Sequence, residues 1–407
     1  MSTAAELQEL VRSHRPGEGL PGPFYLSGDI FELEVERFLG THWMLVGHTS
    51  QLSSAGDYFV VNALGASVIV ARDRSGGINA FHNVCRHRGA RLCDVPSGRA
   101  TLITCRYHGW SYKLNGELAA WRHMPEEAEK GNYSLLRCAV TTFQGFILIC
   151  LKPAEAPDPS QLLQHVEPYW SRYELHSCKV VAERTYRIRA NWKLCVENNL
   201  ECYHCLGGHP EYTAINAFVR ADEAVSRAIV DGFSAFREEW EARMRSAGTL
   251  TGRSEMRTVQ GQMCRAGTVP LAPGKLTASR DGRALAPLLG KVAVYDESVT
   301  TGGIGFLSYL MATCDYALSV TYLPESANTT NAVMRWLVHE DAVAGRDFDL
   351  DELCFIWDET TKQDKELIEL NAAGVGSRGY RPGPYSRLES LTSDFIDRYL
   401  AIMSEAS

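Results

Sequence analysis

Two short loops that each carry one cysteine and one histidine constrain the fold of this chain more than any other feature. The first loop is Cys85-Arg86-His87 and the second is Cys105-Arg106-Tyr107-His108. Runs of β-branched and aromatic residues, separated by turn residues, surround both loops and predict a small antiparallel β domain. We therefore expect two matched loops in one β domain that together supply four ligands to a metal centre.

The mixture of ligands in each loop indicates the kind of centre. A Rieske [2Fe–2S] cluster binds two cysteines through one iron and two histidines through the other, and the imidazoles raise its reduction potential. A structural zinc site uses the same residue types, but usually as Cys-x2–4-Cys and His-x3–5-His pairs. Because each loop here mixes the two types, the sequence favours the cluster over zinc. Its predicted ligands are Cys85, His87, Cys105 and His108.

Outside the β domain the pattern predicts helices and strands of ordinary length. A proline-rich, acidic stretch at residues 152–160 marks the expected end of the β domain, and a helix capped by Asp29 is predicted before it, over residues 29–40. Beyond the boundary we predict helices over 160–173, 351–373 and 391–404, and strands over 178–188, 317–323 and 332–339.

A second group of candidate ligands lies in the segment after residue 191. In a continuous helix Glu197, Glu201 and His204 would share one face. Gly207-Gly208 are expected to end this helix, and His209 precedes a proline and so favours an extended backbone. The break would bring His209 back beside His204, whereas a continuous helix would point the two apart.

A carboxylate is expected as the third ligand, because two histidines and one carboxylate leave positions for O2 at Fe(II). Asp364 is the best candidate, since it falls in the apolar stripe of the helix predicted over 351–373. Burying an ionised carboxylate costs several kcal/mol unless a partner or a metal compensates it. The alternatives are an aspartate at the edge of the stripe and a salt bridge to Lys193 or Lys365. The rival carboxylates Asp358 and Glu359 lie off the inward face.

Three segments carry a family resemblance: CRHRGARLC, CRYHGWSY and ENNLECYHCLGGHPE. They resemble the alpha subunits of Rieske-type non-haem iron oxygenases, and the resemblance extends over nearly the whole chain. It implies an α+β fold, with an antiparallel β Rieske domain followed by a catalytic domain whose curved antiparallel sheet is covered by helices in the helix-grip manner. The implied parts are an N-terminal segment that packs on the catalytic domain (1–42), the Rieske domain (43–152) and the mononuclear iron domain (153–407).

The same resemblance assigns roles in the second site and points to a subgroup. His204 and His209 would bind iron, and Glu201 would link His108 of one subunit to an iron-bound histidine of the next, which implies a homotrimer. The bridging residue is a glutamate here, where aspartate is commoner. This glutamate is one of the features by which the chain resembles the enzymes that oxidise quaternary ammonium compounds, such as glycine betaine monooxygenase and stachydrine demethylase. The others are the segments WLVHEDAVAGRDFDL, WDETTKQDKEL and GVGSRGYRPGPYS. The TTKQD match also places the carboxylate ligand at Asp364.

This subgroup implies an O2-dependent N-demethylation with electrons from a separate NAD(P)H-dependent flavin/iron–sulfur reductase. Hydroxylation of an N-methyl group gives a carbinolamine that loses formaldehyde. A trimethylammonium group accepts no hydrogen bond, so aromatic faces and one carboxylate are expected around it. Candidates are Phe306, Tyr309, Asp315 and Tyr316, for each of which ordinary strand packing is the alternative. An aromatic ring-hydroxylating dioxygenase and a Rieske electron-transfer protein without oxygenase activity stay open as other functions.

Composition excludes several partners. The net charge of −8 argues against a nucleic-acid surface. The N-terminus has no apolar run of signal-peptide length, and no apolar stretch is long enough to span a bilayer, so we expect a cytoplasmic protein without membrane contact.

Most of the 12 cysteines should then be reduced and buried. The glycines at 302–305 lack the strand–turn–helix frame of a dinucleotide loop, so we expect no NAD(P) site.

Overall fold

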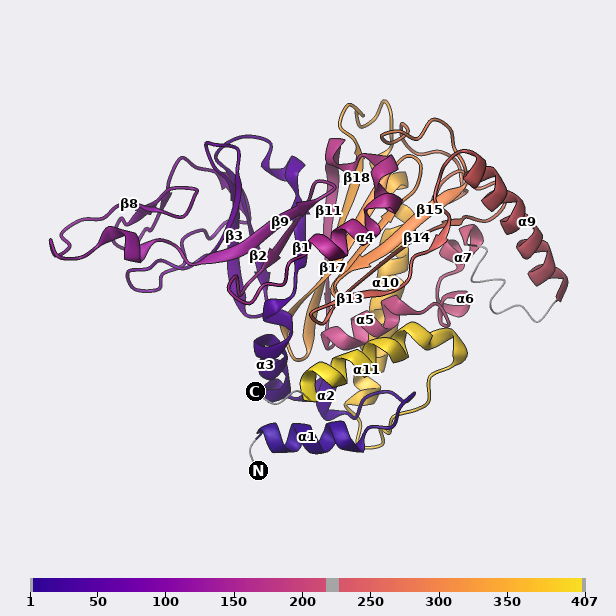
Figure 1. Cartoon of the computed structure of the whole chain (residues 1–407), viewed down its shortest axis with the longest axis horizontal. Coiled ribbons are helices and arrows are strands. Elements are labelled where there is room, and N and C mark those ends of the chain that lie inside the picture. Colours follow the sequence, from indigo (N-terminus) through magenta and orange to yellow (C-terminus); the bar gives the residue numbers. More distant parts are fainter. Residues whose placement is uncertain (1–2, 217–226, 405–407) are drawn as a thin grey trace.

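The computed structural model describes residues 3–216 and 227–404, arranged as two β domains side by side with most helices around the second (Figure 1). The first β domain lies at the left of Figure 1 in indigo to magenta, and the second sheet lies to its right, largely in orange. This two-part α+β arrangement agrees with the predicted fold class.

The first domain contains a seven-stranded antiparallel sheet and a small three-stranded sheet. The large sheet runs in the order β1 (Met44–His48), β10 (Phe146–Cys150), β9 (Arg137–Phe143), β4 (Ile78–His82), β3 (Ala66–Arg72), β2 (Asp57–Ala63) and β5 (Ser97–Arg99). The small sheet comprises β6 (Ile103–Thr104), β7 (Ser111–Tyr112) and β8 (Leu118–Ala120). One predicted cluster loop follows β4, and the other joins β6 to β7.

The second domain is built on an eight-stranded antiparallel sheet. Its order is β11 (Cys178–Ile188), β18 (Thr329–His339), β17 (Ala317–Ser326), β16 (Ser308–Ala312), β15 (Ser298–Ile304), β14 (Gln262–Pro270) and β12 (Gly252–Arg253), with β13 (Arg257–Val259) paired to β14. The first eight residues of β17 are all buried, because the sheet is covered on both faces there. The three predicted strands of this domain are confirmed.

Residues 3–216 and 227–404 contain ten α-helices. They are α1 (Thr3–Ser13), α2 (Pro23–Leu26), α3 (Gly28–Arg37), α4 (Ser160–Trp170), α5 (Trp192–Leu200), α6 (Cys205–Gly208), α7 (Pro210–Ile215), α9 (Arg227–Ser246), α10 (Leu350–Val375) and α11 (Ser390–Ser404). The two long predicted C-terminal helices are confirmed as α10 and α11. The Asp349 carboxylate caps α10 by accepting from the N–H groups of Asp351 (2.9 Å) and Glu352 (3.0 Å).

The N-terminal segment packs against the second domain, where α1 and α3 contact α11. The predicted N-cap of α3 is wrong by two positions. The Ser27 hydroxyl accepts from the N–H of Ile30 (3.3 Å), and Asp29 lies inside the first turn instead. Either residue type caps a helix, so composition alone does not choose between them.

A buried ion pair joins α3 to α5. Lys193 Nζ lies 2.5 Å from Glu34 Oε1, and neither side chain is exposed. The same carboxylate accepts from Trp192 Nε1 (2.7 Å) and from the Tyr399 hydroxyl (2.5 Å). Both oxygens of the Glu34 carboxylate therefore accept hydrogen bonds, which a buried charge requires. This network fixes the start of α5, the helix that leads into the second candidate site.

Cysteine chemistry follows the prediction with one exception. Ten cysteines of the described ranges are free and buried, whereas Cys202 and Cys205 form a disulfide. No helix within residues 3–216 and 227–404 combines the length and apolar character that a membrane span requires.

Candidate metal centres and substrate cavity

The two cluster loops have the same backbone geometry. In each, the cysteine N–H donates to the carbonyl oxygen five residues later (2.8 Å), and the glycine four residues later donates back to the cysteine carbonyl (3.0 Å). These glycines, Gly89 and Gly109, have φ of 77° and 73°, where a side chain would be strained. Repetition of one turn places Cys85 and Cys105 in equivalent positions.

The four predicted cluster ligands divide by burial. Cys85 and Cys105 are 3% and 2% exposed, whereas the imidazoles reach the surface with their Nδ1 atoms 3.1 Å apart. The His87 ring stacks on Trp110 at 4.9 Å between centroids and 9° between planes, which holds its orientation. Buried thiols beside the half-buried His87 and the exposed His108 fit a [2Fe–2S] cluster that has cysteines on its inner iron and histidines on its outer iron.

The second site begins with a turn that the sequence did not predict. Helix α5 ends at Leu200, and Glu201 is extended with φ −128° and ψ 168°. The Glu201 carboxylate accepts from the N–H groups of Tyr203 and of His204, the latter at 3.3 Å. Such side-chain-to-backbone bonds compete with the helix. The expectation of a continuous helix from Glu197 to His204, broken only at Gly207-Gly208, is therefore wrong.

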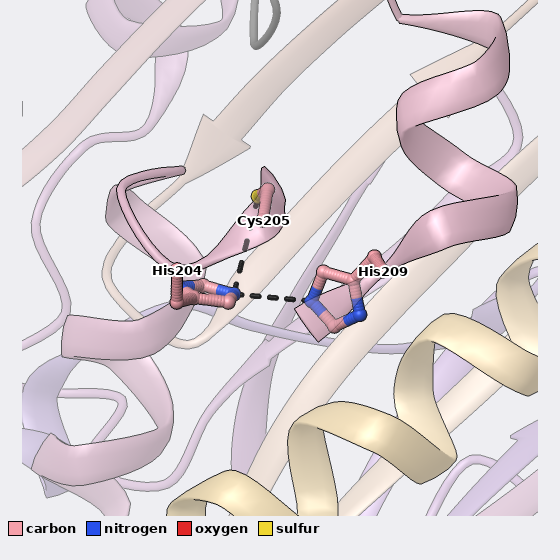
Figure 2. A group of neighbouring side chains, drawn as sticks. All are labelled: His204, Cys205 and His209. Carbon is pink, nitrogen blue, oxygen red and sulfur yellow. Dashed lines mark hydrogen bonds between the residues drawn. The ribbon is translucent and has the colours of Figure 1, made fainter. Parts of the chain in front are cut away.

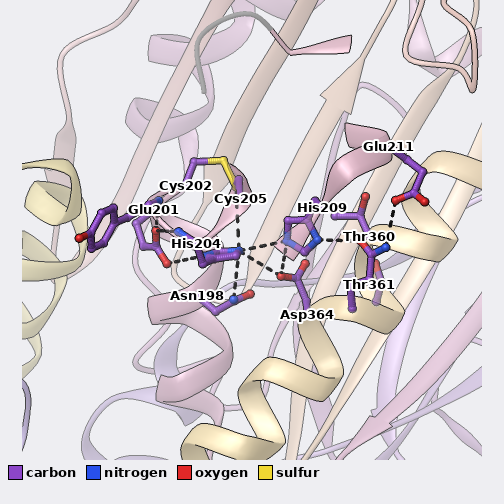
Figure 3. A network of polar contacts seen from close by, with 12 residues as sticks. Asn198, Glu201, Cys202, His204, Cys205, His209, Glu211, Thr360, Thr361 and Asp364 are labelled. Atoms are coloured by element: carbon purple, nitrogen blue, oxygen red, sulfur yellow. Dashed lines mark hydrogen bonds and ion pairs between the residues drawn. A yellow bond between two sulfur atoms is a disulfide. The ribbon is translucent and has the colours of Figure 1, made fainter. Parts of the chain in front are cut away.

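Despite this early break, the three predicted iron ligands meet (Figures 2 and 3). His204 Nε2 and His209 Nε2 are 3.1 Å apart, and Asp364 Oδ1 lies 3.2 Å and 3.0 Å from them. Adjacent corners of an octahedron are √2 bond lengths apart, or about 3 Å for bonds of about 2.1 Å. The triangle of donors thus fits one face of an octahedral metal. Cys205 lies beside His204 in Figure 2, but its sulfur is disulfide-bonded and offers no thiolate.

Both imidazoles are held by a second hydrogen bond. His204 Nδ1 lies 2.5 Å from Glu201 Oε1, and His209 Nδ1 lies 2.9 Å from Gln363 Oε1. Gln363 in turn donates to Glu211 at 3.0 Å. These acceptors place the proton on Nδ1 and turn both Nε2 atoms toward Asp364. The role of Gln363 was missed, although it stands next to Asp364 in the TTKQD segment.

The predicted alternatives for Asp364 are absent among the described contacts. Lys193 pairs with Glu34, and Lys365 pairs with Glu369 at 2.7 Å. Among the described residues, the polar partners of Asp364 Oδ1 are the imidazoles of His204 and His209. A carboxylate kept from both lysines and aimed at two histidines suits a divalent cation.

The charged groups of the triad shift one another's pKa values. Burial alone would raise the pKa of Asp364, but His204 and His209 hold that pKa below its usual range. Burial alone would lower the pKa of His204, yet Asp364 and Glu201 raise it to about 9. The rival carboxylate Asp358 instead forms an ion pair with Arg184 at 2.7 Å.

A cavity of about 390 Å³ lies beside the triad. The Tyr212 ring connects the two, with its centroid 6.4 Å from that of His209 and 5.6 Å from that of Trp357. Glu201 is the one carboxylate among the described lining residues. The lining also includes the aromatic residues Tyr212, Phe306, Tyr309 and Trp357 and the arginines Arg253 and Arg265. Tyr212, Trp357 and both arginines were not among the predicted substrate residues.

Of the four predicted substrate residues, Phe306 and Tyr309 line this cavity and the other two do not. Asp315 is fully buried and accepts from the Thr277 hydroxyl (2.6 Å) and the Leu285 N–H (2.7 Å), so it serves the interior. The Tyr316 hydroxyl accepts from Trp357 Nε1 at 2.7 Å, behind the ring that reaches the cavity. Asp315 and Tyr316 are close in sequence to the lining strands, but this closeness does not determine the direction in which their side chains point.

The two candidate centres lie in different parts of the molecule. The second cluster loop joins β6 to β7, next to β8 at the far left of Figure 1, whereas α6 and α7 lie toward the right. Within one chain the cluster loops and the triad are therefore far apart.

Comparison with known proteins shows the family. Residues 175–405 match the ring hydroxylating alpha subunit (catalytic domain), and residues 42–144 match the Rieske [2Fe-2S] domain. The chain therefore belongs to the alpha subunits of Rieske-type oxygenases, which carry a Rieske cluster and a mononuclear iron and use O2. It is the oxygenase component of a multicomponent enzyme that takes electrons from a separate reductase.

One relative and two solved structures are similar to this chain over nearly its whole length. The glycine betaine monooxygenase oxygenase subunit of Pseudomonas aeruginosa is 34% identical over 96% of this chain and 90% of its own length. The crystal structure of the quaternary ammonium Rieske monooxygenase CntA with γ-butyrobetaine superposes with a TM-score of 0.71, 22% identity and coverage of 98% and 99%. Naphthalene 1,2-dioxygenase from Rhodococcus sp. superposes with a TM-score of 0.68 at 18% identity, covering 99% and 97%. The fold alone thus does not choose the substrate.

Proposed function

We propose that this oxygenase hydroxylates an N-methyl group of a quaternary ammonium substrate of the betaine type. The observation that carries the proposal is the set of aromatic rings beside the triad, in which Tyr212 contacts both His209 and Trp357. Aromatic faces attract a quaternary ammonium group, which can neither donate nor accept a hydrogen bond. The full-length likeness to a glycine betaine monooxygenase subunit supports the same substrate class.

The residues of the triad have defined tasks in this proposal. Asp364 and the Nε2 atoms of His204 and His209 would hold Fe(II), which supplies O2 activation when bound. Glu201 and Gln363 would hold both imidazoles in the orientation that turns each Nε2 toward Asp364. Tyr212 and Trp357 bind the ammonium group so that one methyl group faces the triad. The resulting carbinolamine breaks its C–N bond, which releases formaldehyde, a proton and the tertiary amine.

We also propose that Cys85, His87, Cys105 and His108 hold the cluster and that electrons pass between subunits. Because the two centres lie far apart in one chain, electrons would pass between subunits of a homotrimer in which the partner subunit's His108 meets Glu201. Glu201 already bonds His204, so it would be the positioning residue that joins the two imidazoles. The exposed imidazoles would also face a flavin/iron–sulfur reductase that oxidises NAD(P)H. The buried free thiols suit a cytoplasmic protein.

The test is formaldehyde release with NADH and a reductase. Glycine betaine, proline betaine and carnitine are compared with arenes, and His209→Ala serves as a control that should keep the cluster spectrum and lose turnover. We expect formaldehyde from at least one betaine. Diol formation from arenes without formaldehyde would instead assign an aromatic dioxygenase, and cluster reduction without any oxygenation would leave only electron transfer.

A further inference from the structure

The substrate cavity has a positively charged end that a cationic substrate by itself does not explain. Arg253 and Arg265 both line it, although a quaternary ammonium group would be repelled by them. Arg265 forms no ion pair and no side-chain hydrogen bond within the described ranges, and it is only partly exposed. A half-buried guanidinium without an ion pair or hydrogen bond suits an anionic ligand.

Strand register places this arginine on the cavity face of the sheet. Arg265 in β14 is the partner of Gly303 in β15, and Gly303 is the partner of Tyr309 in β16. Directly paired residues project to the same face, so the guanidinium and the phenol rise on either side of a glycine. Adjacent strands lie about 4.8 Å apart, which puts the backbones of Arg265 and Tyr309 about 10 Å apart.

Gly303 leaves the space between these two side chains open. A Cβ added at this position would meet only the carbonyl oxygens of Ser308 and Gly305, at 3.5 Å and 3.6 Å, and no side chain within 4 Å. The floor between the arginine and the tyrosine is therefore bare backbone. A small molecule lying over Gly303 would reach the guanidinium at one end and the aromatic rings at the other.

The second arginine strengthens the positive end. Arg253 in β12 is the partner of Gly267 in β14, and a Cβ added at Gly267 would lie 2.7 Å from Arg253 Cγ. The glycine thus lets the stem of Arg253 lie across the strand on the face that also carries Arg265. Burial lowers the pKa of Arg265, the charge of Arg253 lowers it further, and Asp394 opposes this shift.

The cavity is consequently bipolar. Its aromatic end, with Tyr212 and Trp357, adjoins the triad, and its cationic end lies over β12 and β14. Glu201, its one carboxylate among the described lining residues, is already bonded to His204. Such a distribution fits a zwitterion whose ammonium group points to the triad and whose anionic group points away from it.

We infer that Arg265, assisted by Arg253, binds the carboxylate of the substrate and selects quaternary ammonium carboxylates over quaternary ammonium alcohols. This inference rests on the proposed function and adds that the substrate carboxylate is bound at the end of the cavity far from the triad. A planar guanidinium matches a carboxylate with two parallel hydrogen bonds. Anchoring of that carboxylate over β14 then sets which N-methyl group reaches the triad.

The experiment compares the binding of glycine betaine and choline to anaerobic holoenzyme by calorimetry. The variants are Arg265→Gln, Arg265→Lys and the control Arg257→Gln, which removes an exposed charge from β13 outside the cavity lining. Loss of hydrogen bonds to a charged group corresponds to a weakening of about 10- to 100-fold. We expect Arg265→Gln to weaken glycine betaine by that factor and to leave choline unchanged or tighter. Arg265→Lys should be intermediate, and Arg257→Gln should match the wild type.

Formaldehyde release by the wild type separates the two proposals. If the wild type demethylates betaines but the betaine-to-choline ratio is the same in Arg265→Gln, the inference is wrong and the proposed function stands. If the wild type neither binds nor oxidises a quaternary ammonium compound, both are overturned. Circular dichroism of each variant verifies the fold, and a misfolded Arg265→Gln is replaced in the comparison by Arg265→Lys, whose unchanged ratio would equally contradict the inference.

Discussion

The two metal centres of this chain are built in opposite ways. The cluster loops repeat one local turn, with the same two hydrogen bonds and a left-handed glycine in each. The proposed iron triad takes His204 and His209 from a broken helical segment and Asp364 from α10, 155 residues beyond His209. The first site depends on short segments of backbone, whereas the second depends on how α5, α6 and α10 pack.

This difference teaches where each centre is vulnerable. The cluster ligands are supported by bonds within their own loops, so distant changes should leave them in place. The iron ligands depend on Glu201, on Gln363 and on the buried pair that anchors α5. Substitutions in the second domain should therefore separate the two centres, and the following predictions test that separation.

The largest effect is expected from removing a ligand of one centre. Asp364→Ala should lose the mononuclear iron and more than about 100-fold of the turnover, since even outer partners of metal ligands contribute about 10- to 100-fold. The visible and EPR spectra of the cluster should be retained. Cys105→Ala should do the reverse, with a colourless protein that still binds one iron. Iron analysis and EPR give both results, and joint loss in either variant would contradict independent sites.

Breaking the anchor of α5 should cost stability. Lys193→Met leaves the Glu34 carboxylate buried without its cation, which is expected to lower the free energy of unfolding by about 3–5 kcal/mol. Thermal unfolding followed by near-UV circular dichroism measures this loss. The control Lys113→Met, which breaks the exposed pair with Glu117, should leave Tm nearly unchanged. A Lys193→Met protein as stable as the wild type would show that the pair does not support α5.

The next effect depends on pH. Burial raises the pKa of Glu197 to about 7, although Tyr25 and Tyr385 donate hydrogen bonds to it and oppose the shift. The folded state then binds more protons than the unfolded chain between the ordinary pKa of 4.5 and about 7, so stability falls as pH rises through this window. Glu197→Gln should therefore gain on the order of 3 kcal/mol over the wild type above pH 7 and little near pH 4.5.

Differential scanning calorimetry at both ends of that window compares the variant with the wild type. The difference in Tm between the two proteins should grow as pH rises. A constant difference would mean that Glu197 is ionised in the folded protein throughout this range.

The smallest effect is expected at Gln363. Gln363→Leu removes the acceptor of His209 Nδ1, and loss of such a partner typically costs about 10- to 100-fold in metal affinity or activity. Iron affinity and formaldehyde release measure the change. Glu366→Gln, on the exposed side of the same helix, is the matched control and should behave as the wild type. Equal activity of the two variants would show that His209 needs no second partner.

Much of the fold followed from the sequence. Strands β11, β17 and β18 and helices α10 and α11 were predicted because their apolar periodicity or length is local information. The cap of α3 and the end of α5 were not. At both places a side chain with several possible partners, Ser27 or Glu201, bonds the backbone at one particular position. Such competition between local hydrogen bonds is settled only by the surrounding packing.

The sequence by itself predicted the ligand chemistry: four mixed cysteine and histidine ligands in two loops, and two histidines with a carboxylate. Only the tertiary structure decided that Gln363 orients His209, that Asp315 points into the interior, and that Arg265 and Tyr309 face each other across Gly303. The physical reason is range. Ligand type and turn geometry are properties of neighbouring residues, whereas a cavity arises from strand register and helix packing between segments far apart in the chain.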